Sequence, residues 1–110
     1  AASDVYKRQG QNIYPEEIES KLNNMPYVSE SLIVLQKDKL VALIYPDFDD
    51  AFAHGMEQSD IEKVMEDNRN ELNLQLPAYC QITKVKIHFE EFEKTAKKSI
   101  KRFMYQEVKG

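Results

Sequence analysis

Two short apolar runs near the middle of the chain constrain the fold more than any other feature of the sequence. Leu32–Leu35 (LIVL) and Leu40–Ile44 (LVALI) are separated by the polar residues Gln36–Lys39. Apolar runs of this length around a short polar segment are typical of a β-hairpin. The sequence therefore predicts two adjacent strands, and the second should end at Pro46, before the acidic segment Asp47–Asp50.

A helix is predicted before this hairpin. Pro15 suits a first helical turn, Pro26 should end the helix, and the apolar residues between them recur at helical spacing: Ile18, Leu22 and Met25. After the hairpin, Ala51–Gln58 is interpreted as a connecting loop with room for one turn of helix.

A second helix is predicted after this loop. Ser59 and Glu62 have the spacing of a capping box, Pro77 closes the helix, and one face carries Ile61, Val64, Met65 and Leu72.

The remaining segments complete an α+β two-layer sandwich. Gln81–Phe89 (QITKVKIHF) alternates apolar and polar residues as a half-exposed strand does, and Arg102–Glu107 is predicted as a short C-terminal helix. A sheet of about three strands should therefore be covered by two helices. A length of 110 residues fits one domain, and a deep catalytic cleft is hard to build at this size, so complex chemistry would need a partner domain.

Composition excludes several classes of protein. With 42% hydrophobic and 31% charged residues, the sequence is typical of a globular domain. Leu40–Tyr45, the longest apolar run, is far shorter than the roughly 20 residues of a membrane helix. Cys80 is the single cysteine and cannot form an internal disulfide, so we expect a reducing cytoplasm.

A metal site is not expected. His54, His88 and Cys80 lack metal-ligand spacing, and Asp47–Asp50 lacks the loop pattern of a calcium site and is better interpreted as a solvated turn. His88 lies on the polar face of its predicted strand and is interpreted as a solvated histidine rather than a general base.

The region from residue 94 to 102 is strongly basic in an otherwise acidic chain. The net charge is −4, and the five cations of this region contribute +5, so the rest of the chain carries −9. Alone, such a run is typical of a solvated surface, although its lysines and Thr95 could also bind phosphate. A second segment, Gly10-Gln11-Asn12, places a glycine and two amide side chains before the helix at Pro15, where they could approach a ligand.

Together these two segments resemble a known family. Gly10 to Gln106 is similar to the C-terminal domain of AMP-forming acyl-CoA synthetases, the superfamily that also contains luciferases and peptide-synthetase adenylation domains. GQNIYPEEIE resembles the pattern G-x-x-I-x-P-x-E-I-E, and EKTAKKSIKR resembles P-K-T-x-x-G-K-I-x-R. The flanking EFEKT and RFMYQ are most similar to long-chain fatty acid–CoA ligases. The matching residues are Gly10, Ile13, Pro15, Glu17, Ile18 and Glu19 in the first motif, and Lys94, Thr95, Ile100 and Arg102 in the second.

The resemblance implies a role as a mobile lid. In this family a large N-terminal domain binds ATP, with its Mg²⁺, and the carboxylic acid. The small domain closes over it, and the motif lysine neutralises charge while an acyl-adenylate forms. The small domain then rotates, and its glycine segment lines the tunnel for coenzyme A. The resemblance thus assigns Gly10, Gln11 and Asn12 to coenzyme A, and Thr95 and Arg102 to ligand contacts in the basic run.

The second motif departs from the family pattern at its most important position. Aligned without gaps, Glu93 replaces the proline, Lys98 replaces the glycine and Ser99 stands in place of the catalytic lysine. Either Lys98 or Lys97 reaches the site by a local shift, or adenylation is weak, or another cation acts. We favour the first explanation.

Residues 1–9 do not resemble the family's hinge segment, and we interpret them as extraneous sequence or a truncated hinge, with the lid domain spanning residues 10–110. The fragment alone should be inactive. Two other functions stay open: a peptide-synthetase adenylation lid, which serves a carrier protein, and a non-enzymatic module that binds an acidic partner or nucleic acid through the basic run. The acidic remainder of the chain disfavours nucleic acid.

Overall fold

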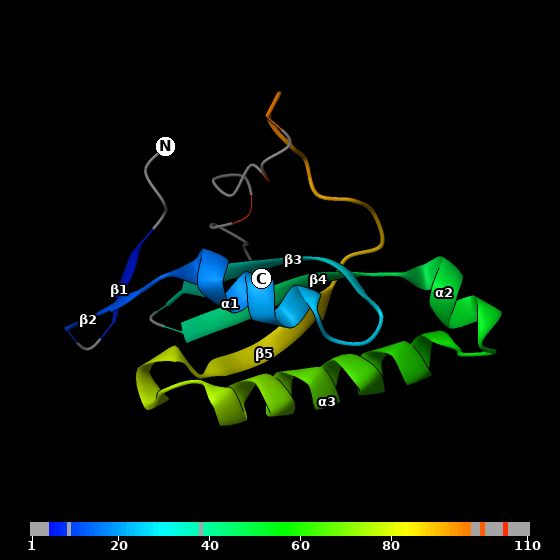
Figure 1. Ribbon diagram of the computed structural model, residues 1–110, viewed down its shortest axis with the longest axis horizontal. Helices are drawn as coiled ribbons and strands as arrows, with labels where there is room; N and C mark the ends of the chain where they lie inside the picture. The colour runs from blue at the N-terminus through cyan, green and yellow to red at the C-terminus, as the bar shows by residue number, and fades with distance from the viewer. Residues whose placement is uncertain (1–4, 9, 38, 98–99, 101–104, 106–110) are drawn as a thin grey trace.

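The predicted hairpin lies at the centre of the structure, a computed structural model that describes residues 5–8, 10–37, 39–97, 100 and 105. Strands β3 (Val28–Gln36) and β4 (Lys39–Pro46) pair antiparallel, with Leu32 opposite Leu43. Strand β5 (Ile82–Ile87) adds to β4 in the parallel direction, so the sheet order is β3-β4-β5 (Figure 1).

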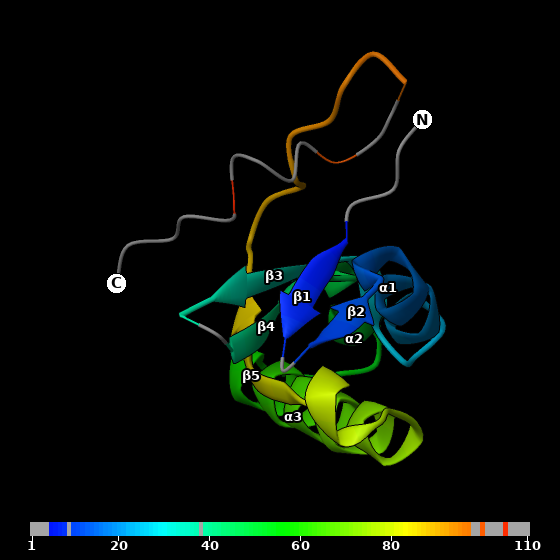
Figure 2. The same ribbon diagram turned by 90° about the vertical axis from the view of Figure 1, so that its left-hand side faces the viewer.

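Two helices cover one face of this sheet, which confirms the predicted α+β fold. Helix α1 (Pro15–Asn23) and helix α3 (Gln58–Gln75) lie on the same side of β3, β4 and β5 (Figures 1 and 2). Their apolar faces and the strands share one core, because apolar residues at helical spacing meet apolar residues at every second strand position. Its fully buried side chains include Ile13, Leu22, Ile33, Leu40, Ile44, Ile61, Met65, Leu72 and Ile82.

The opposite face of the sheet is also buried. Leu32 and Val34 of β3 and Val41 and Leu43 of β4 point away from the helices and pack against the segment that follows β5. Phe92 is the buried anchor of this second cluster, and Ile100 and Tyr105 pack around it. The continuous apolar runs of β3 and β4 are explained by this burial on both faces.

A small hairpin precedes α1 and was not predicted. Strands β1 (Tyr6–Arg8) and β2 (Gln11–Ile13) pair antiparallel, and the Tyr6 hydroxyl donates a hydrogen bond of 3.0 Å to the carbonyl oxygen of Ile33. Tyr6–Arg8 thus has a place in the fold, although it lies in the segment that the sequence analysis set apart from the domain. Whether residues 1–9 derive from a hinge stays a prediction.

Helix α1 is fastened to β3 by a buried carboxylate. Glu19 Oε2 accepts a 2.7 Å hydrogen bond from the main-chain N–H of Ile33, and the Glu19 side chain is almost fully buried. Pro15 and Ile18 are buried as well. Much of the first motif therefore serves to seat α1 on the sheet.

The segment after β4 differs from its prediction at Asp47–Asp50, which begin a helix rather than a turn, whereas the turn of helix allowed after Ala51 is present and the three aspartates are exposed as predicted. Helix α2 (Phe48–Ala53) begins directly after Asp47, whose Oδ1 accepts a 3.1 Å hydrogen bond from the N–H of Asp50. The aspartates cap the helix and complement its positive end, so they are part of a helix rather than a solvated turn. The helix buries only Ala51, which explains its weak apolar periodicity.

The start of α3 also differs from its prediction. The capping box joins Glu57 and Asp60, and the Glu57 N–H donates to Asp60 Oδ2 at 3.0 Å. Glu57 has extended backbone angles, whereas Ser59 already lies inside the first turn. The predicted box of Ser59 and Glu62 was therefore wrong by two residues, because both pairs have the required spacing.

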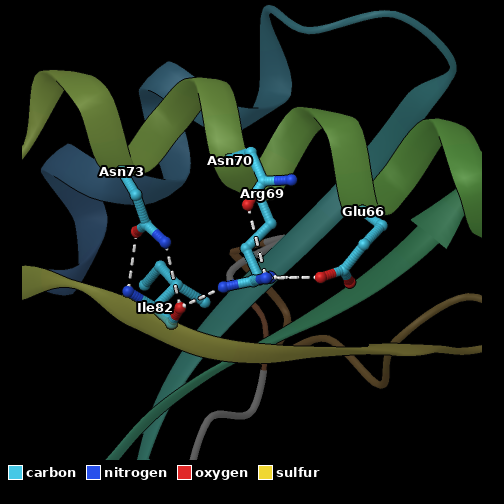
Figure 3. A network of polar contacts seen from close by, with 5 residues as sticks. All are labelled: Glu66, Arg69, Asn70, Asn73 and Ile82. Atoms are coloured by element: carbon cyan, nitrogen blue, oxygen red, sulfur yellow. Dashed lines mark hydrogen bonds and ion pairs between the residues drawn. The ribbon is translucent and has the colours of Figure 1, made fainter.

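Polar side chains join α3 to the start of β5 (Figure 3). The Asn73 amide donates to the carbonyl oxygen of Ile82 at 3.1 Å and accepts from the N–H of the same residue at 2.7 Å. Arg69 Nη1 donates to the same carbonyl at 2.9 Å, and its guanidinium also pairs with Glu66. Asn73 thus acts as a strand partner for the first residue of β5.

The short 3₁₀ helix η1 (Ala78–Cys80) connects α3 to β5 and follows Pro77, which ends α3 as expected. The predicted C-terminal helix, Arg102–Glu107, lies outside the described residues except for Tyr105. Within the described ranges, no helix is long and apolar enough to cross a membrane. The same part of the chain contains no cluster of three or more histidine, cysteine or acidic side chains that could hold a metal ion.

Candidate functional site

The segment at residues 88–94, here called the arm, leads from the end of β5 to the basic region and rises away from the helices (Figures 1 and 2). Lys94 and Ile100 form an antiparallel bridge, which brings the two ends of the basic segment between them together. Thr95 and Lys97 are exposed. The bridge therefore presents Lys97 to solvent from a closed loop, while Ile100 packs on the second face of the sheet.

Glu30 of β3 holds the first arm of this loop. Its Oε1 accepts a 3.3 Å hydrogen bond from the main-chain N–H of Phe92, and its Oε2 pairs with the Lys94 ammonium at 2.5 Å. The hydrogen bond to Glu30 raises the pKa of Lys94 above its ordinary value. Lys94 stays protonated and is engaged at the base of the loop.

Tyr105 supports the same arm from the other side. Its hydroxyl oxygen accepts a 2.8 Å hydrogen bond from the N–H of Glu93. Its ring lies edge-on to Phe92, with ring centroids 5.1 Å apart. The arm from residue 92 to 94 is thus held by one hydroxyl and one carboxylate above an aromatic core.

His88 belongs to this aromatic core and is not the solvated histidine that was predicted. It is half-buried, with its ring centroid 4.8 Å from that of Phe92 and 5.8 Å from that of Tyr105. Burial, and secondarily the nearby Lys86 charge, lower its pKa below the ordinary value of 6.5. The alternating pattern of β5 does place His88 opposite the helices, but the returning chain covers that face.

Three of the predicted site residues, Lys98, Ser99 and Arg102, lie outside the described residues. Their assignment, and the choice between Lys97 and Lys98 as the catalytic cation, stay predictions. Glu30 and Tyr105 were missed by the sequence analysis. Glu30 is a single acidic residue beside a buried strand, which is a weak signal, and its partners lie more than 60 positions away in the sequence.

The glycine segment forms the tip of the β1–β2 hairpin. Gly10 has φ of +78°, in the left-handed region that favours glycine. Gln11 and Asn12 are exposed, whereas Ile13 is fully buried and anchors the strand. The hairpin thus offers two amide side chains to solvent beside a tight turn.

The structure does not bring the two predicted sites together. The β1–β2 hairpin lies near the N-terminal end of α1, whereas the chain at residues 92–97 stands out from the body of the domain beyond the sheet (Figures 1 and 2).

Comparison with known proteins agrees with the fold. The sequence model of the family described as AMP-binding enzyme C-terminal domain matches residues 3–107. Among solved structures, the acyl-CoA synthetase of Brucella canis is 24% identical, with a TM-score of 0.71 over 96% of this chain and 19% of its own. An anthranilate CoA ligase in complex with anthranoyl-AMP is 26% identical, with a TM-score of 0.68 over 93% of this chain and 18% of its own.

A fatty acyl CoA synthetase of Mycobacterium tuberculosis is 20% identical, with a TM-score of 0.60 over 94% of this chain and 19% of its own. The chain therefore spans about a fifth of the length of the structures it matches. A search of the curated proteins found no match.

Proposed function

The chain belongs to the family of AMP-binding enzyme C-terminal domains, and from this premise we propose that it is the mobile lid of an AMP-forming acyl-CoA ligase. Its partner is the N-terminal adenylate-forming domain of the parent protein, which supplies the pockets for ATP and the carboxylic acid. The observation that carries the proposal is the separation of two exposed motif segments on one domain (Figures 1 and 2). Such an arrangement suits a domain that turns first one segment and then the other toward the active site of its N-terminal partner domain.

In the first half-reaction the basic loop faces the nucleotide. The carboxylate oxygen of the acid attacks the α-phosphorus of ATP, and pyrophosphate leaves. A cation from the loop stabilises the negative charge on the carboxylate and phosphate oxygens, an electrostatic contribution worth several kcal/mol in a closed site, on the order of 3. Lys97 supports this role because it is exposed on a loop whose base is fixed. Lys98 is the second candidate.

In the second half-reaction the domain rotates and the hairpin faces the active site. The thiol of coenzyme A attacks the acyl carbonyl carbon, and AMP leaves. Gly10 allows a close approach of the main chain because it has no side chain, and nothing lies within 4 Å of the position that a Cβ would occupy. The exposed amides of Gln11 and Asn12 can hydrogen bond to the amide groups of the pantetheine arm.

ATP and coenzyme A act as substrates in this proposal. The Mg²⁺ that accompanies ATP is proposed to be bound mainly by the N-terminal domain, together with the nucleotide. We place the parent enzyme in the cytoplasm, where ATP and coenzyme A are available and the buried Cys80 thiol would stay reduced.

The acid is proposed to be a long-chain fatty acid. The support is the resemblance of EFEKT (91–95) and RFMYQ (102–106) to long-chain ligases. Initial rates of the parent enzyme with acids of increasing chain length test this assignment. A preference for an aromatic or dicarboxylic acid would overturn it while leaving the lid function intact.

The lid function itself is tested on the parent enzyme. Lys97→Ala and Lys98→Ala, made separately, should identify the cation by a loss of pyrophosphate release of roughly 100-fold or more in one variant. Lys63→Ala is a matched control, because Lys63 is exposed on α3. Unchanged pyrophosphate release in both loop variants would refute the shifted-lysine mechanism. Failure of the domain to restore ATP- and CoA-dependent thioester formation to a matching N-terminal domain would count against the lid function.

A further inference from the structure

The arm that leads into the basic loop is fastened to the sheet by the buried ring of Phe92 and by one carboxylate, that of Glu30. Glu30 lies on β3 beside an irregularity in the β3–β4 register, between Val28 and Glu30. Its side chain is 19% exposed, and each oxygen has its own partner on the arm: the N–H of Phe92 and the ammonium of Lys94.

Glu30 contacts the arm at two positions, Phe92 and Lys94, which are two residues apart. The Phe92 ring is 3% exposed and enters the second core, while its N–H turns toward Glu30. Two positions later, the Lys94 side chain is 28% exposed and also turns toward Glu30. Lys94 is the residue that bridges to Ile100 and closes the loop. Glu30 therefore joins the base of the loop to β3, in addition to the packing of Phe92 and Ile100 on the sheet.

Loss of the Glu30 charge would affect both groups. The Lys94 ammonium would lose its acidic partner, which is the loss of a partly exposed ion pair. The N–H of Phe92 would keep an acceptor only if the replacement offered an oxygen. The arm has further polar support from the hydrogen bond between the Glu93 N–H and the Tyr105 hydroxyl and from the bridge between Lys94 and Ile100.

We propose that Glu30 is a positioning residue for the adenylation half-reaction, which it serves by fixing the base of the basic loop through Lys94 and Phe92. The catalytic part of this inference rests on the proposed function. Lys94 is accordingly a structural cation, and the charge that reaches the substrate comes from further along the loop. A displacement of about 1 Å in a catalytic group can reduce a rate by up to roughly 100-fold, so the position of the base matters for catalysis.

The anchoring is tested on the full 110-residue chain by limited trypsin digestion. Glu30→Gln keeps an oxygen for the Phe92 N–H but removes the charge. It should raise the rate of tryptic cleavage after the lysines and the arginine of residues 97–102 roughly three- to fivefold. Cleavage after Lys63 in α3 reports global unfolding and should not change. Glu71→Gln, on the exposed face of α3, is the matched control.

Coupling between the two charges gives a readout that a general loss of stability would not produce. Lys94→Met should raise loop cleavage about as much as Glu30→Gln, and the double variant should add little to either single change. Wild-type cleavage rates in Glu30→Gln, additive effects in the double variant, or a parallel rise after Lys63 would each overturn the anchoring.

The catalytic part is tested on the parent enzyme with the two half-reactions measured separately. Glu30→Gln should lower the maximal rate of pyrophosphate release roughly 10- to 100-fold and leave thioester formation from supplied acyl-adenylate unchanged. Glu30→Asp should restore part of the lost rate. Equal losses in both half-reactions, or in neither, would refute the positioning role. If the wild-type parent released no pyrophosphate, the proposed function and this catalytic role would both fail, whereas the digestion result would still decide the anchoring.

Discussion

Asn73 provides a quantitative test of how α3 holds β5. Replacing Asn73 with alanine removes two hydrogen bonds to the main chain of Ile82, at 2.7 and 3.1 Å. Each such bond contributes about 1 kcal/mol to the free energy of unfolding. After the substitution the Ile82 carbonyl keeps Arg69 as a donor, whereas the Ile82 N–H loses its Asn73 acceptor. The higher helix propensity of alanine returns about 0.5 kcal/mol. The expected loss in the free energy of unfolding is therefore about 1.5 kcal/mol.

Urea denaturation of the full chain measures this loss. With a denaturant slope near 2 kcal/mol/M, which is ordinary for a small domain, the midpoint should fall by about 0.7 M. Asn70→Ala is the matched control, because Asn70 is exposed on the same helix and gains the same helix propensity. Asn70 accepts only a long hydrogen bond of 3.4 Å from Arg69 Nη2, whereas Arg69 binds Ile82 through Nη1. It should leave the midpoint unchanged or raise it slightly. Equal midpoints for the two variants would refute the assignment of Asn73 as the strand partner of β5.

Three further predictions follow from the structure. Glu57→Ala should lower the free energy of unfolding, measured from urea midpoints, by about 1 kcal/mol, and Ser59→Ala by far less. A larger loss for Ser59→Ala would instead support the capping box of Ser59 and Glu62. The pKa of His88 is lowered in the folded state, so its contribution to stability is present above about pH 6.5 and is lost as the pH falls toward the folded pKa; His88→Phe should flatten the pH dependence of the urea midpoint in that window, and an unchanged slope would contradict it. Gly10→Ala, at φ of +78°, should strain the hairpin by roughly 1 kcal/mol and slow thioester formation by the parent enzyme more than pyrophosphate release, whereas equal effects on both would argue against its role toward coenzyme A.

Local patterns were enough to predict the two main helices and the central hairpin. The apolar residues of α1 and α3 recur at helical spacing, and Pro15, Pro26 and Pro77 mark their limits. Such signals depend only on neighbouring residues, because the period of a helix or strand is a property of the local backbone. Both motif segments are also readable from the sequence alone, because their resemblance to the family depends on residue identity and spacing and not on their positions in space.

Contacts between distant residues decided the rest. β1 and α2 are short and bury few side chains, so their stability comes from tertiary contacts such as that of Tyr6 with Ile33. The burial of His88 could not be predicted from alternation, because alternation shows which face a residue takes and not what covers that face. The same is true of Glu30, which meets Lys94 only because the segment after β5 packs back onto the second face of the sheet. The two charges are 64 positions apart in the sequence, so only the folded chain brings them together.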